Sequence, residues 1–315
     1  MKKFNSKNIL IAGVTGSGKS NFLHTMIEDL LNENSPHDLR LILIDPKMVE
    51  FSLYDGIPHL LTDVITKTDK ARSAFRWLWS ESFRRLRVME ELNCSSVQKY
   101  NKLKYTKNKL PKLYVFVDEF SDLMADDKKL YEEYFRKITA LSGLTEIYLV
   151  ISTSRPDPKN VVTKNVLDCF STRIAFKTAT GKDSAVVIGK EGAEELPETG
   201  HFLLRELSSF EIKKLELPAV EEGELKKDLD AIKHKYADFK KEEQEKKEEY
   251  SGKNDDDLYP YAVEIAKENG RISASLIQRK LRVGYARAAR LLDLLEENGL
   301  VETANGVTPR KYIGE

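Results

Sequence analysis

Short apolar runs alternate with longer stretches of helical periodicity from Asn8 to about Leu217. The run ILIA precedes a helical pattern that begins at Lys19, LRLILID follows it, an amphipathic stretch spans Ala71 to Leu92, and LYVFVDEF and IYLVIST come next. Continuous apolar runs separated by helices are typical of parallel strands buried on both faces. The later runs TRIAF, HFLL and FEIKKLEL are predicted to complete or border the sheet. The pattern therefore predicts an α/β fold with a mostly parallel sheet.

The pattern changes after Pro218. Residues 218–257 are dominated by Glu, Lys and Asp, and large apolar side chains are nearly absent between Phe239 and Leu258. Opposite charges at i,i+4 spacing support a solvated helix, but such a composition buries no core. We therefore predict a charged, flexible linker over residues 218–257.

Apolar periodicity returns from Leu258 in YAVEIA, SLIQRKLRV and ARAARLLDLLEENGLV. The segment ETANGVTPRKYI follows, and its Asn305-Gly306 pair suits a tight hairpin turn. Three helices and a hairpin indicate a small winged-helix domain. A length of 315 residues has room for one large and one smaller domain. The predicted organisation is an α/β domain at 1–217, the linker at 218–257 and a winged helix at 258–315.

Charge and cysteine content narrow the class of protein. Lys plus Arg and Asp plus Glu number 51 each, so any affinity for nucleic acid has to be local. Cys94 and Cys169 are far apart in the sequence and lack a cluster of ligand residues, which indicates reduced structural thiols in a cytoplasmic protein. No window approaches the ~18 apolar residues of a membrane span. We expect a cytoplasmic protein with no intrinsic membrane segment.

The segment GVTGSGKS, residues 13–20, matches the phosphate-binding pattern G-x-x-x-x-G-K-[ST] between a predicted strand and a predicted helix. Its glycines allow backbone N–H groups to face phosphate oxygens, and Lys19 is expected to reach the β- and γ-phosphates. The hydroxyl of Ser20 is expected to bind Mg²⁺. The alternative is a glycine-rich turn that binds no nucleotide. The predicted contacts to ATP are Gly13, Val14, Thr15, Gly16, Ser17, Gly18, Lys19, Ser20 and Asn21.

Two carboxylates end the predicted strand LYVFV. Asp118 is expected to bind Mg²⁺ with Ser20, and Glu119 is expected to act as the general base that polarises the attacking water. Together with Lys19 they form the predicted catalytic set, and the paired carboxylates favour a hydrolase over a kinase. An exposed turn is the alternative for an Asp-Glu pair considered alone.

A third predicted strand, IYLVIST, ends in Thr153, Ser154 and Arg155. Polar groups at this end of a parallel sheet lie where ligands bind. We expect Thr153 to contact the nucleotide and the group to sense its γ-phosphate, whereas a simple turn is the alternative.

These residues resemble the FtsK/SpoIIIE family of DNA translocases. The resemblance lies in GVTGSGKSN, in LILIDPKMVEFSLYDGIPHLLTDVITKTDKARSAFRWL, in VFVDEFSDLM, in STSRP and STRIAF, and in GYARAARLLDLLEENGLV. It implies a RecA-like P-loop motor that assembles as a homo-hexamer on double-stranded DNA and pumps the DNA by ATP hydrolysis. It also implies a winged helix that reads short DNA sequences to orient loading. Asp45 and Lys47 of the IDPK segment match the family and are interpreted as ring-interface or nucleotide-coupling residues.

Several positions depart from the family pattern. An arginine that reaches the neighbouring subunit's nucleotide is expected about 25 residues after Asp118, where this chain has Gly143. Either Arg136 or Arg155 replaces it, or turnover is slow. Ser154 replaces a usual glutamine. The glycine loop begins a dozen residues from the start of the sequence, so we expect a motor without the membrane anchor of larger relatives.

The C-terminal segment is expected to read DNA. Ala289, Leu292, Leu295 and Leu300 define an apolar stripe, and basic and aromatic residues gather at the start of the last helix, the end that enters the major groove in helix-turn-helix proteins. Ala286 stands where relatives often carry asparagine. A solvated basic face on a protein-binding domain is the alternative. The predicted DNA contacts are Arg282, Tyr285, Arg287 and Arg290.

Three functions remain open at this point. The first is a double-stranded DNA translocase of the chromosome segregation and cell division type. The second is a motor that transfers plasmid or phage DNA, with a recombinase, relaxase or membrane-protein partner. The third is a slow ATP-gated DNA clamp, which the glycine at position 143 would favour.

Overall fold

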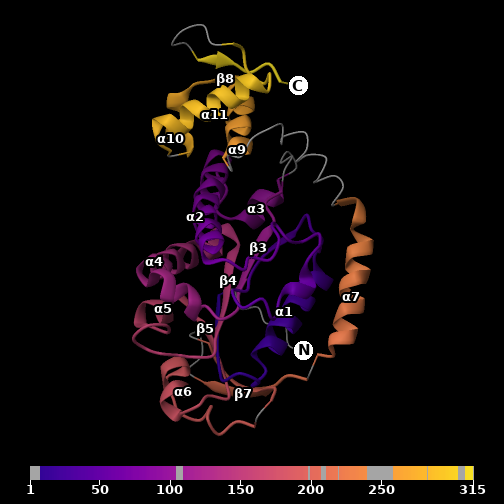
Figure 1. Cartoon of the computed structure of the whole chain (residues 1–315), viewed down its shortest axis with the longest axis vertical. Coiled ribbons are helices and arrows are strands. Elements are labelled where there is room, and N and C mark those ends of the chain that lie inside the picture. Colours follow the sequence, from indigo (N-terminus) through magenta and orange to yellow (C-terminus); the bar gives the residue numbers. More distant parts are fainter. Residues whose placement is uncertain are drawn as a thin grey trace. The chain divides into compact units, whose positions relative to one another are not determined.

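The computed structural model describes residues 8–103, 109–197, 199–206, 211–218, 220–239, 258–281, 283–303 and 309–314. The chain divides into two compact units, Met1–Ala237 and Asp238–Glu315 (Figure 1). Each unit has its own hydrophobic core. The two units are therefore described separately.

A seven-stranded sheet forms the centre of the first unit, in the order β2-β3-β4-β1-β5-β6-β7. The first five strands in sequence pair in parallel, and β6 and β7 join as an antiparallel edge. The predicted α/β fold with a mostly parallel sheet is confirmed. The strands are β1 (Ile9–Ala12), β2 (Leu39–Ile44), β3 (Lys112–Val117), β4 (Ile147–Thr153), β5 (Thr172–Phe176), β6 (His201–Glu206) and β7 (Ile212–Glu216).

Helices cover both faces of this sheet, which explains the continuous apolar runs of its strands. Alternate residues of β1 enter different cores: Ile9 and Ile11 pack with α1 on one face, and Leu10 packs with α2 and α4 on the other. The helices of the first unit before β6 are α1 (Lys19–Glu33), the 3₁₀ helix η1 (Ser52–Tyr54), α2 (Thr68–Glu91), α3 (Val97–Asn101), α4 (Ser121–Thr145), α5 (Lys164–Cys169) and α6 (Gly181–Ile188).

Four neighbouring strands, β2, β3, β4 and β1, end at the same edge of the sheet because they run in parallel. Asp45 follows β2, Asp118 follows β3, Ser154 follows β4, and the glycine loop follows β1. Ligands bind outside the carboxyl ends of strands in sheets of this type. The fold thus gathers the predicted chemical groups at one edge.

Part of the predicted linker packs onto the first unit. Residues Glu222–Lys235 form α7, and Leu225, Leu229 and Ile232 are buried in the core that contains α1. Their spacing of four and three residues places them on one face of a helix. The high average charge of the segment concealed this stripe, so residues 222–235 contribute to the core instead of bridging the two units.

The described residues of the second unit form three helices and a small antiparallel sheet, as expected for a winged helix. The elements are α9 (Tyr259–Asn269), β8 (Arg271–Ile272), α10 (Ala274–Leu281), α11 (Tyr285–Glu297) and β9 (Arg310–Lys311). Strand β8 pairs with β9, and Val301 bridges to Tyr312. The predicted turn at Asn305-Gly306 lies outside the described residues.

The buried face of α11 is shifted slightly from the predicted stripe. Leu292 and Leu295 are buried, but Ala289 is only half-buried and Ala288 and Leu291 take the remaining core positions. Position 300, the last of the predicted stripe, follows α11 and is also half-buried. The extrapolated stripe was thus offset by one residue where it started and ran past the end of the helix.

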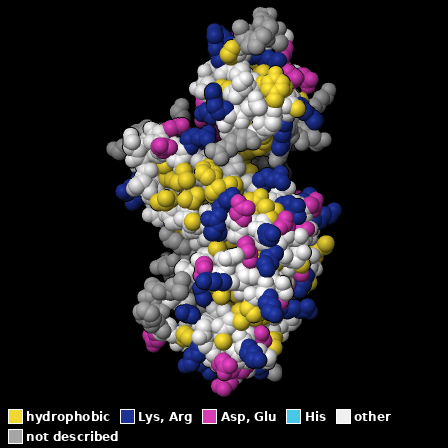
Figure 2. All heavy atoms as spheres, turned by 90° about the vertical axis from the view of Figure 1, so that its left-hand side faces the viewer, with side chains coloured by type: hydrophobic (Ala, Val, Ile, Leu, Met, Phe, Trp, Pro, Cys, Tyr) yellow, Lys and Arg dark blue, Asp and Glu magenta, His cyan; other side chains and the backbone are white. Residues whose placement is uncertain are grey.

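Exposed hydrophobic side chains occur on α2 and α4 of the first unit. Phe83 and Leu144 are 37% and 44% exposed, and Trp79 packs edge-on against Phe83. Figure 2 shows hydrophobic side chains gathered on the side of the first unit where α4 lies. A contiguous exposed apolar patch is typical of an interaction surface.

Among the described residues, no helix combines the length and the apolar character that crossing a membrane requires.

Candidate active site

The loop between β1 and α1 has a conformation that its glycines permit. Gly16 and Gly18 have φ angles of 80° and 108°, which side-chain-bearing residues rarely adopt. At Gly13, an added Cβ would lie 2.7 Å from the Cβ of Phe176 and 2.8 Å from the Oγ of Ser17. The loop therefore needs glycine for its backbone angles at two positions and for space at a third.

Lys19 and Ser17 carry groups in this loop that can bind an anion. The Nζ of Lys19 donates hydrogen bonds to the carbonyl oxygens of Gly13 and Val14 at 2.8 and 3.0 Å. Burial lowers the pKa of Lys19, although the charges of Asp118 and Glu119 oppose this. The buried Oγ of Ser17 is among the few buried polar atoms in the described residues with no hydrogen-bond partner. An unsatisfied hydroxyl, an ammonium and the free N–H groups at the start of α1 fit a phosphate group. Thr15 and Gly16 are exposed at the rim of the loop.

Oxygen donors suited to Mg²⁺ lie beside the loop. The Oγ of Ser20 donates to Oε1 of Glu50 at 2.7 Å, and the Oγ of Ser152 donates to Oδ1 of Asp118 at 2.6 Å. Burial raises the pKa of Asp118. Hydroxyl and carboxylate oxygens are ligands that Mg²⁺ prefers, and phosphates and water complete its shell in nucleotide sites. The described residues contain no group of three or more His, Cys, Asp or Glu side chains that would hold a metal by themselves. Ser20 and Asp118 fit a metal bound jointly with nucleotide.

The Glu119 carboxylate is held by hydroxyl groups of neighbouring segments. It accepts hydrogen bonds from Oγ of Ser121 at 2.6 Å, Oγ1 of Thr153 at 2.7 Å and Oγ of Ser154 at 2.5 Å. The Nζ of Lys47 lies 3.5 Å from its Oε2. Burial alone would raise the pKa of Glu119, but these hydrogen bonds outweigh burial and lower it to about 2.

The backbone of Glu119 is also unusual. Its φ is 51°, a left-handed conformation that costs free energy for residues other than glycine. The N–H of Phe120 donates to the carbonyl oxygen of Ser152 at 2.8 Å and holds this turn in place. Strand β4 therefore positions Glu119 through both its backbone and its side chains.

Asp45 shapes the loop that follows β2. Its side chain is buried, and its carboxylate accepts hydrogen bonds from the N–H groups of Lys47, Glu50 and Phe51 at 3.2, 2.8 and 3.0 Å. These bonds turn the loop so that Lys47 faces Glu119 and Glu50 faces Ser20. Sequence reasoning singled out Asp45 and Lys47 but missed Glu50. Its only signal was its place inside the family-like IDPKMVEF segment.

Asn21, predicted to contact the nucleotide, uses both polar atoms of its side chain elsewhere. Its Nδ2 donates to the carbonyl oxygen of Pro218 at 2.7 Å, and its Oδ1 accepts from the N–H of Val220 at 2.6 Å. These two hydrogen bonds fasten the segment before α7 to α1, next to Ser20, which is predicted to bind Mg²⁺.

We expect Asn21→Ala to loosen α7. Two hydrogen bonds that join segments about 200 residues apart in sequence are lost, at a cost of about 1–3 kcal/mol. Hydrogen–deuterium exchange should become faster across 220–235, with Asn160→Ala, an exposed asparagine, as the matched control. Unchanged exchange in α7 would show that the hydrogen bonds of Asn21 do not stabilise this helix.

The candidate replacements for the missing arginine lie in different places. Gly143 is exposed near the end of α4. Arg136 is exposed two turns earlier on the same helix and borders a cavity of about 280 Å³. Arg155 is exposed directly after β4, at the edge of the sheet that carries the glycine loop. Arg155 is thus near this chain's own site, and Arg136 is on the outer surface of a covering helix.

Three of the four predicted DNA contacts lie in the first turns of α11 in the second unit. Tyr285 is 64% exposed, Arg290 is exposed and Arg287 is half-buried. Arg282 lies outside the described residues. Between Gly270 and Asp293 the sequence contains six basic residues and no acidic ones: Arg271, Arg279, Lys280, Arg282, Arg287 and Arg290. This local basic segment contrasts with the net charge of zero of the whole chain.

Comparison with known proteins gives two family matches. The model of the FtsK/SpoIIIE family matches residues 1–158, and the model of the Ftsk gamma domain matches residues 253–314. A DNA translocase FtsK of Caldanaerobacter subterraneus subsp. tengcongensis is 36% identical over 310 residues, which are 97% of this chain and 43% of the relative. A DNA translocase FtsK of Clostridium acetobutylicum is 36% identical over 315 residues, which are 97% of this chain and 41% of the relative. The chain spans about two-fifths of the length of these curated relatives.

Solved structures show the same fold as the first unit. The pCW3 conjugation coupling protein TcpA, in its monomer form with ATPγS, aligns with a TM-score of 0.62 and 29% identity over 72% of this chain and 65% of that chain. The cytoplasmic domain of the type VII secretion ATPase EccC of Thermomonospora curvata aligns with a TM-score of 0.62 and 23% identity over 72% of this chain and 28% of that chain. The fold of the first unit is therefore that of P-loop ATPases.

Proposed function

The chain belongs to the FtsK/SpoIIIE family, and from this premise we propose that it is an ATPase that moves double-stranded DNA. One observation carries the proposal furthest. Three neighbouring parallel strands bring the phosphate-binding loop, Asp118 and Glu119 to one edge of the sheet. A metal-binding carboxylate beside an ionised base at a phosphate loop is the arrangement that ATP hydrolysis requires.

The residues divide the work of hydrolysis. The loop N–H groups and Lys19 bind the phosphates, and Ser20 and Asp118 hold Mg²⁺, which neutralises charge on the phosphates when bound. Glu119 is anionic at neutral pH and can accept the proton of an attacking water. In the present conformation its oxygens are engaged by Ser121, Thr153 and Ser154. The N–H of Ser154 also donates to this carboxylate at 3.0 Å, so its roughly four acceptor sites are filled, and water activation requires it to exchange one partner for the water.

The DNA substrate is inferred from the relatives and from the second unit. The relatives' names state that they are DNA translocases. The basic segment of the second unit matches the electrostatic requirement for phosphate contacts. Tyr285 and Arg290 are exposed in the first turns of α11, the position from which recognition helices contact base edges. We propose that this unit reads DNA sequence and orients the motor.

The double variant Arg287→Ala/Arg290→Ala should weaken binding of the full chain to short duplex DNA by about 10-fold. In a plot of log affinity against log salt concentration, the slope should be smaller in magnitude by about 2, because two phosphate-neutralising charges are lost. Fluorescence anisotropy at several salt concentrations measures both quantities. Lys70→Ala/Lys182→Ala, which removes two exposed lysines of the first unit, is the charge-matched control. Wild-type affinity in the arginine variant would favour a protein partner for α11.

Assembly as a homo-hexameric ring is part of the proposal. The exposed Phe83 and Leu144 supply apolar surface for a neighbouring subunit. An arginine from the neighbour, or Arg155 from the same chain, would supply the positive charge that the family places at position 143. A slow clamp remains the outcome if neither does so.

A second candidate task is transfer of DNA during conjugation. The observation that favours it is the 29% identity to the conjugation coupling protein TcpA. The site would be the same, but the partners would be a relaxase, a recombinase or a membrane protein. For either task we propose that the protein acts in the cytoplasm, because DNA is its substrate.

Steady-state ATP hydrolysis with and without long duplex DNA tests the proposed function. We expect duplex DNA to increase the rate at least several-fold, because a motor couples turnover to its track. Equal rates with and without DNA would contradict a translocase and favour the clamp.

A further inference from the structure

Ser20 is the residue of the phosphate loop whose hydroxyl is expected to bind Mg²⁺. Its Oγ donates a hydrogen bond of 2.7 Å to Oε1 of Glu50, a residue 30 positions away in the sequence. A hydroxyl that gives a lone pair to a cation has to direct its single proton elsewhere. Glu50 supplies the acceptor for that proton.

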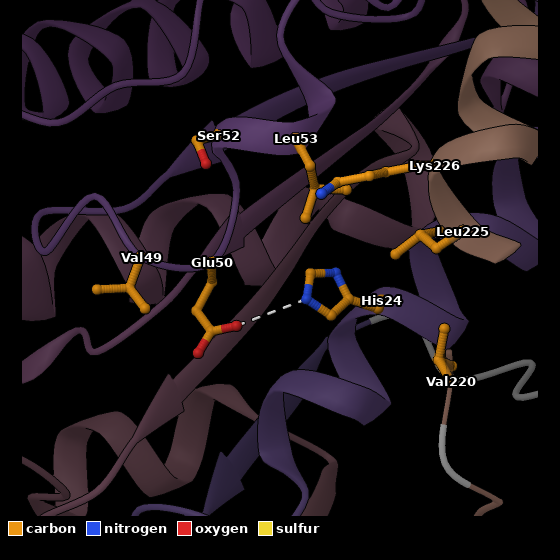
Figure 3. A pocket seen from close by; sticks show the side chains of 8 residues that line it. All are labelled: His24, Val49, Glu50, Ser52, Leu53, Val220, Leu225 and Lys226. Atoms are coloured by element: carbon orange, nitrogen blue, oxygen red, sulfur yellow. Dashed lines mark ion pairs between the residues drawn. The ribbon is translucent and has the colours of Figure 1, made fainter. Parts of the chain in front are cut away.

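Glu50 is itself oriented by side chains other than Ser20. Its Oε2 lies 3.5 Å from Nε2 of His24, and Nδ1 of His24 lies 2.8 Å from the hydroxyl of Tyr54. Figure 3 shows His24 and Glu50 pointing toward one another across the ion pair. A chain of polar contacts thus leads from Tyr54 through His24 and Glu50 to Ser20.

The backbone fixes the same arrangement. The N–H of Glu50 donates to Oδ2 of the buried Asp45, and the adjacent N–H of Phe51 donates to the same oxygen. His24 lies on α1, one turn after Ser20, so it approaches Glu50 from the helix that carries the metal site. A loop and a helix hold Glu50 in one orientation.

We propose that Glu50 is a positioning residue that orients the Ser20 hydroxyl for Mg²⁺ and raises the affinity of the nucleotide site for the metal. Partners behind a metal ligand fix its orientation and increase its donor strength, and their loss typically costs about 10–100-fold in metal affinity. This inference rests on the proposed ATP and Mg²⁺ site and adds a carboxylate that lies outside both the glycine loop and the Asp118-Glu119 pair.

Glu50 lies near α7 as well as near the phosphate loop. Glu50 and His24 border a cavity of about 400 Å³, and Leu225 and Lys226 of α7 form another part of its wall (Figure 3). The two hydrogen bonds of Asn21 hold the start of α7 against the same helix. Glu50 therefore lies between the metal site and the helix that ends the first unit.

Binding of a fluorescent ADP analogue, mant-ADP, to the full-length chain tests the proposal. Mg²⁺ is titrated at fixed mant-ADP, and the affinity is also measured in EDTA. We expect Glu50→Ala to raise the half-saturating Mg²⁺ concentration about 10-fold and to change the affinity in EDTA less than 2-fold. Glu50→Gln should give an intermediate value, because its amide oxygen still accepts the Ser20 proton. Glu33→Ala, at the exposed end of α1, is the control.

A double-mutant cycle with Ser20→Ala separates positioning from general loss of structure. If Glu50 acts through Ser20, adding Glu50→Ala to Ser20→Ala has no further effect on Mg²⁺ dependence. Additive effects, an unchanged Mg²⁺ midpoint in Glu50→Ala, or an equal loss of affinity in EDTA would each overturn the inference. If the wild-type chain gains no mant-ADP affinity from Mg²⁺, the proposed function itself fails, and this outcome is distinct from a failure confined to Glu50.

Discussion

Glu119→Gln should reduce the rate of ATP hydrolysis by about 10³-fold and leave ATP binding nearly unchanged. The amide keeps the size of the side chain, and its single oxygen can still accept the hydrogen bond of either Thr153 or Ser154, which bind different oxygens of Glu119. It cannot take a proton from water, and general-base catalysis contributes about 10²–10⁴-fold to rates. Phosphate release under saturating ATP measures the rate, and equilibrium binding of mant-ATP measures the affinity.

Glu133→Gln is the matched control, because it makes the same change at an exposed position of α4. A hydrolysis rate in Glu119→Gln within 10-fold of wild type would assign the base to another residue. Loss of ATP binding in that variant would instead show that the carboxylate mainly maintains the loop structure.

The pH dependence of stability gives Glu119 a second readout. Its pKa of about 2 in the folded chain is below the ordinary value of 4.5, so ionised Glu119 stabilises the fold above pH 4.5. This contribution is lost as the pH falls from 4.5 toward 2. The free energy of unfolding of Glu119→Gln should therefore change less than that of wild type across this range. Urea denaturation at successive pH values measures the difference.

Lys19→Ala should weaken ATP binding by about 100-fold, the second large effect we expect. The Lys19 ammonium is buried and already points into the loop, where it hydrogen-bonds to the carbonyl oxygens of Gly13 and Val14. Its removal deletes a charge-assisted contact to phosphate, and a 100-fold change corresponds to about 2.7 kcal/mol. Isothermal titration with ATP and Mg²⁺ measures the affinity.

Lys70→Ala removes an exposed lysine of α2 and is expected to bind ATP as wild type does. If Lys19→Ala also binds ATP with wild-type affinity, the glycine loop is not the phosphate site. The melting temperature of the variant has to be compared in parallel, since a folded variant with weak binding is the predicted outcome.

The sequence predicted much of the fold because each signal was local. Apolar runs such as LRLILI and YLVIST are buried throughout, so their composition alone indicates parallel strands covered on both faces. The glycine loop was recognisable because its backbone angles and the close approach of Phe176 require glycine. A strand ending in two carboxylates was equally visible.

The remaining features depend on contacts between distant segments. Glu119 accepts hydrogen bonds from Thr153 and Ser154 because β3 and β4 are neighbours in the sheet. The sequence of a single segment does not determine which strands are neighbours. Glu50 reaches Ser20 only because the Asp45 carboxylate folds the intervening loop back. Asn21 holds a backbone segment that a motif search has no means of finding.

Displacement of a third strand from a triplex-bearing duplex is the direct assay for ATP-driven translocation, because only movement along DNA removes a strand that is bound some distance away. We expect the wild-type chain to release the labelled third strand when ATP and Mg²⁺ are present, and Glu119→Gln to bind ATP but release none. An intact triplex while wild-type protein hydrolyses ATP on the same DNA would contradict the claim that hydrolysis drives translocation.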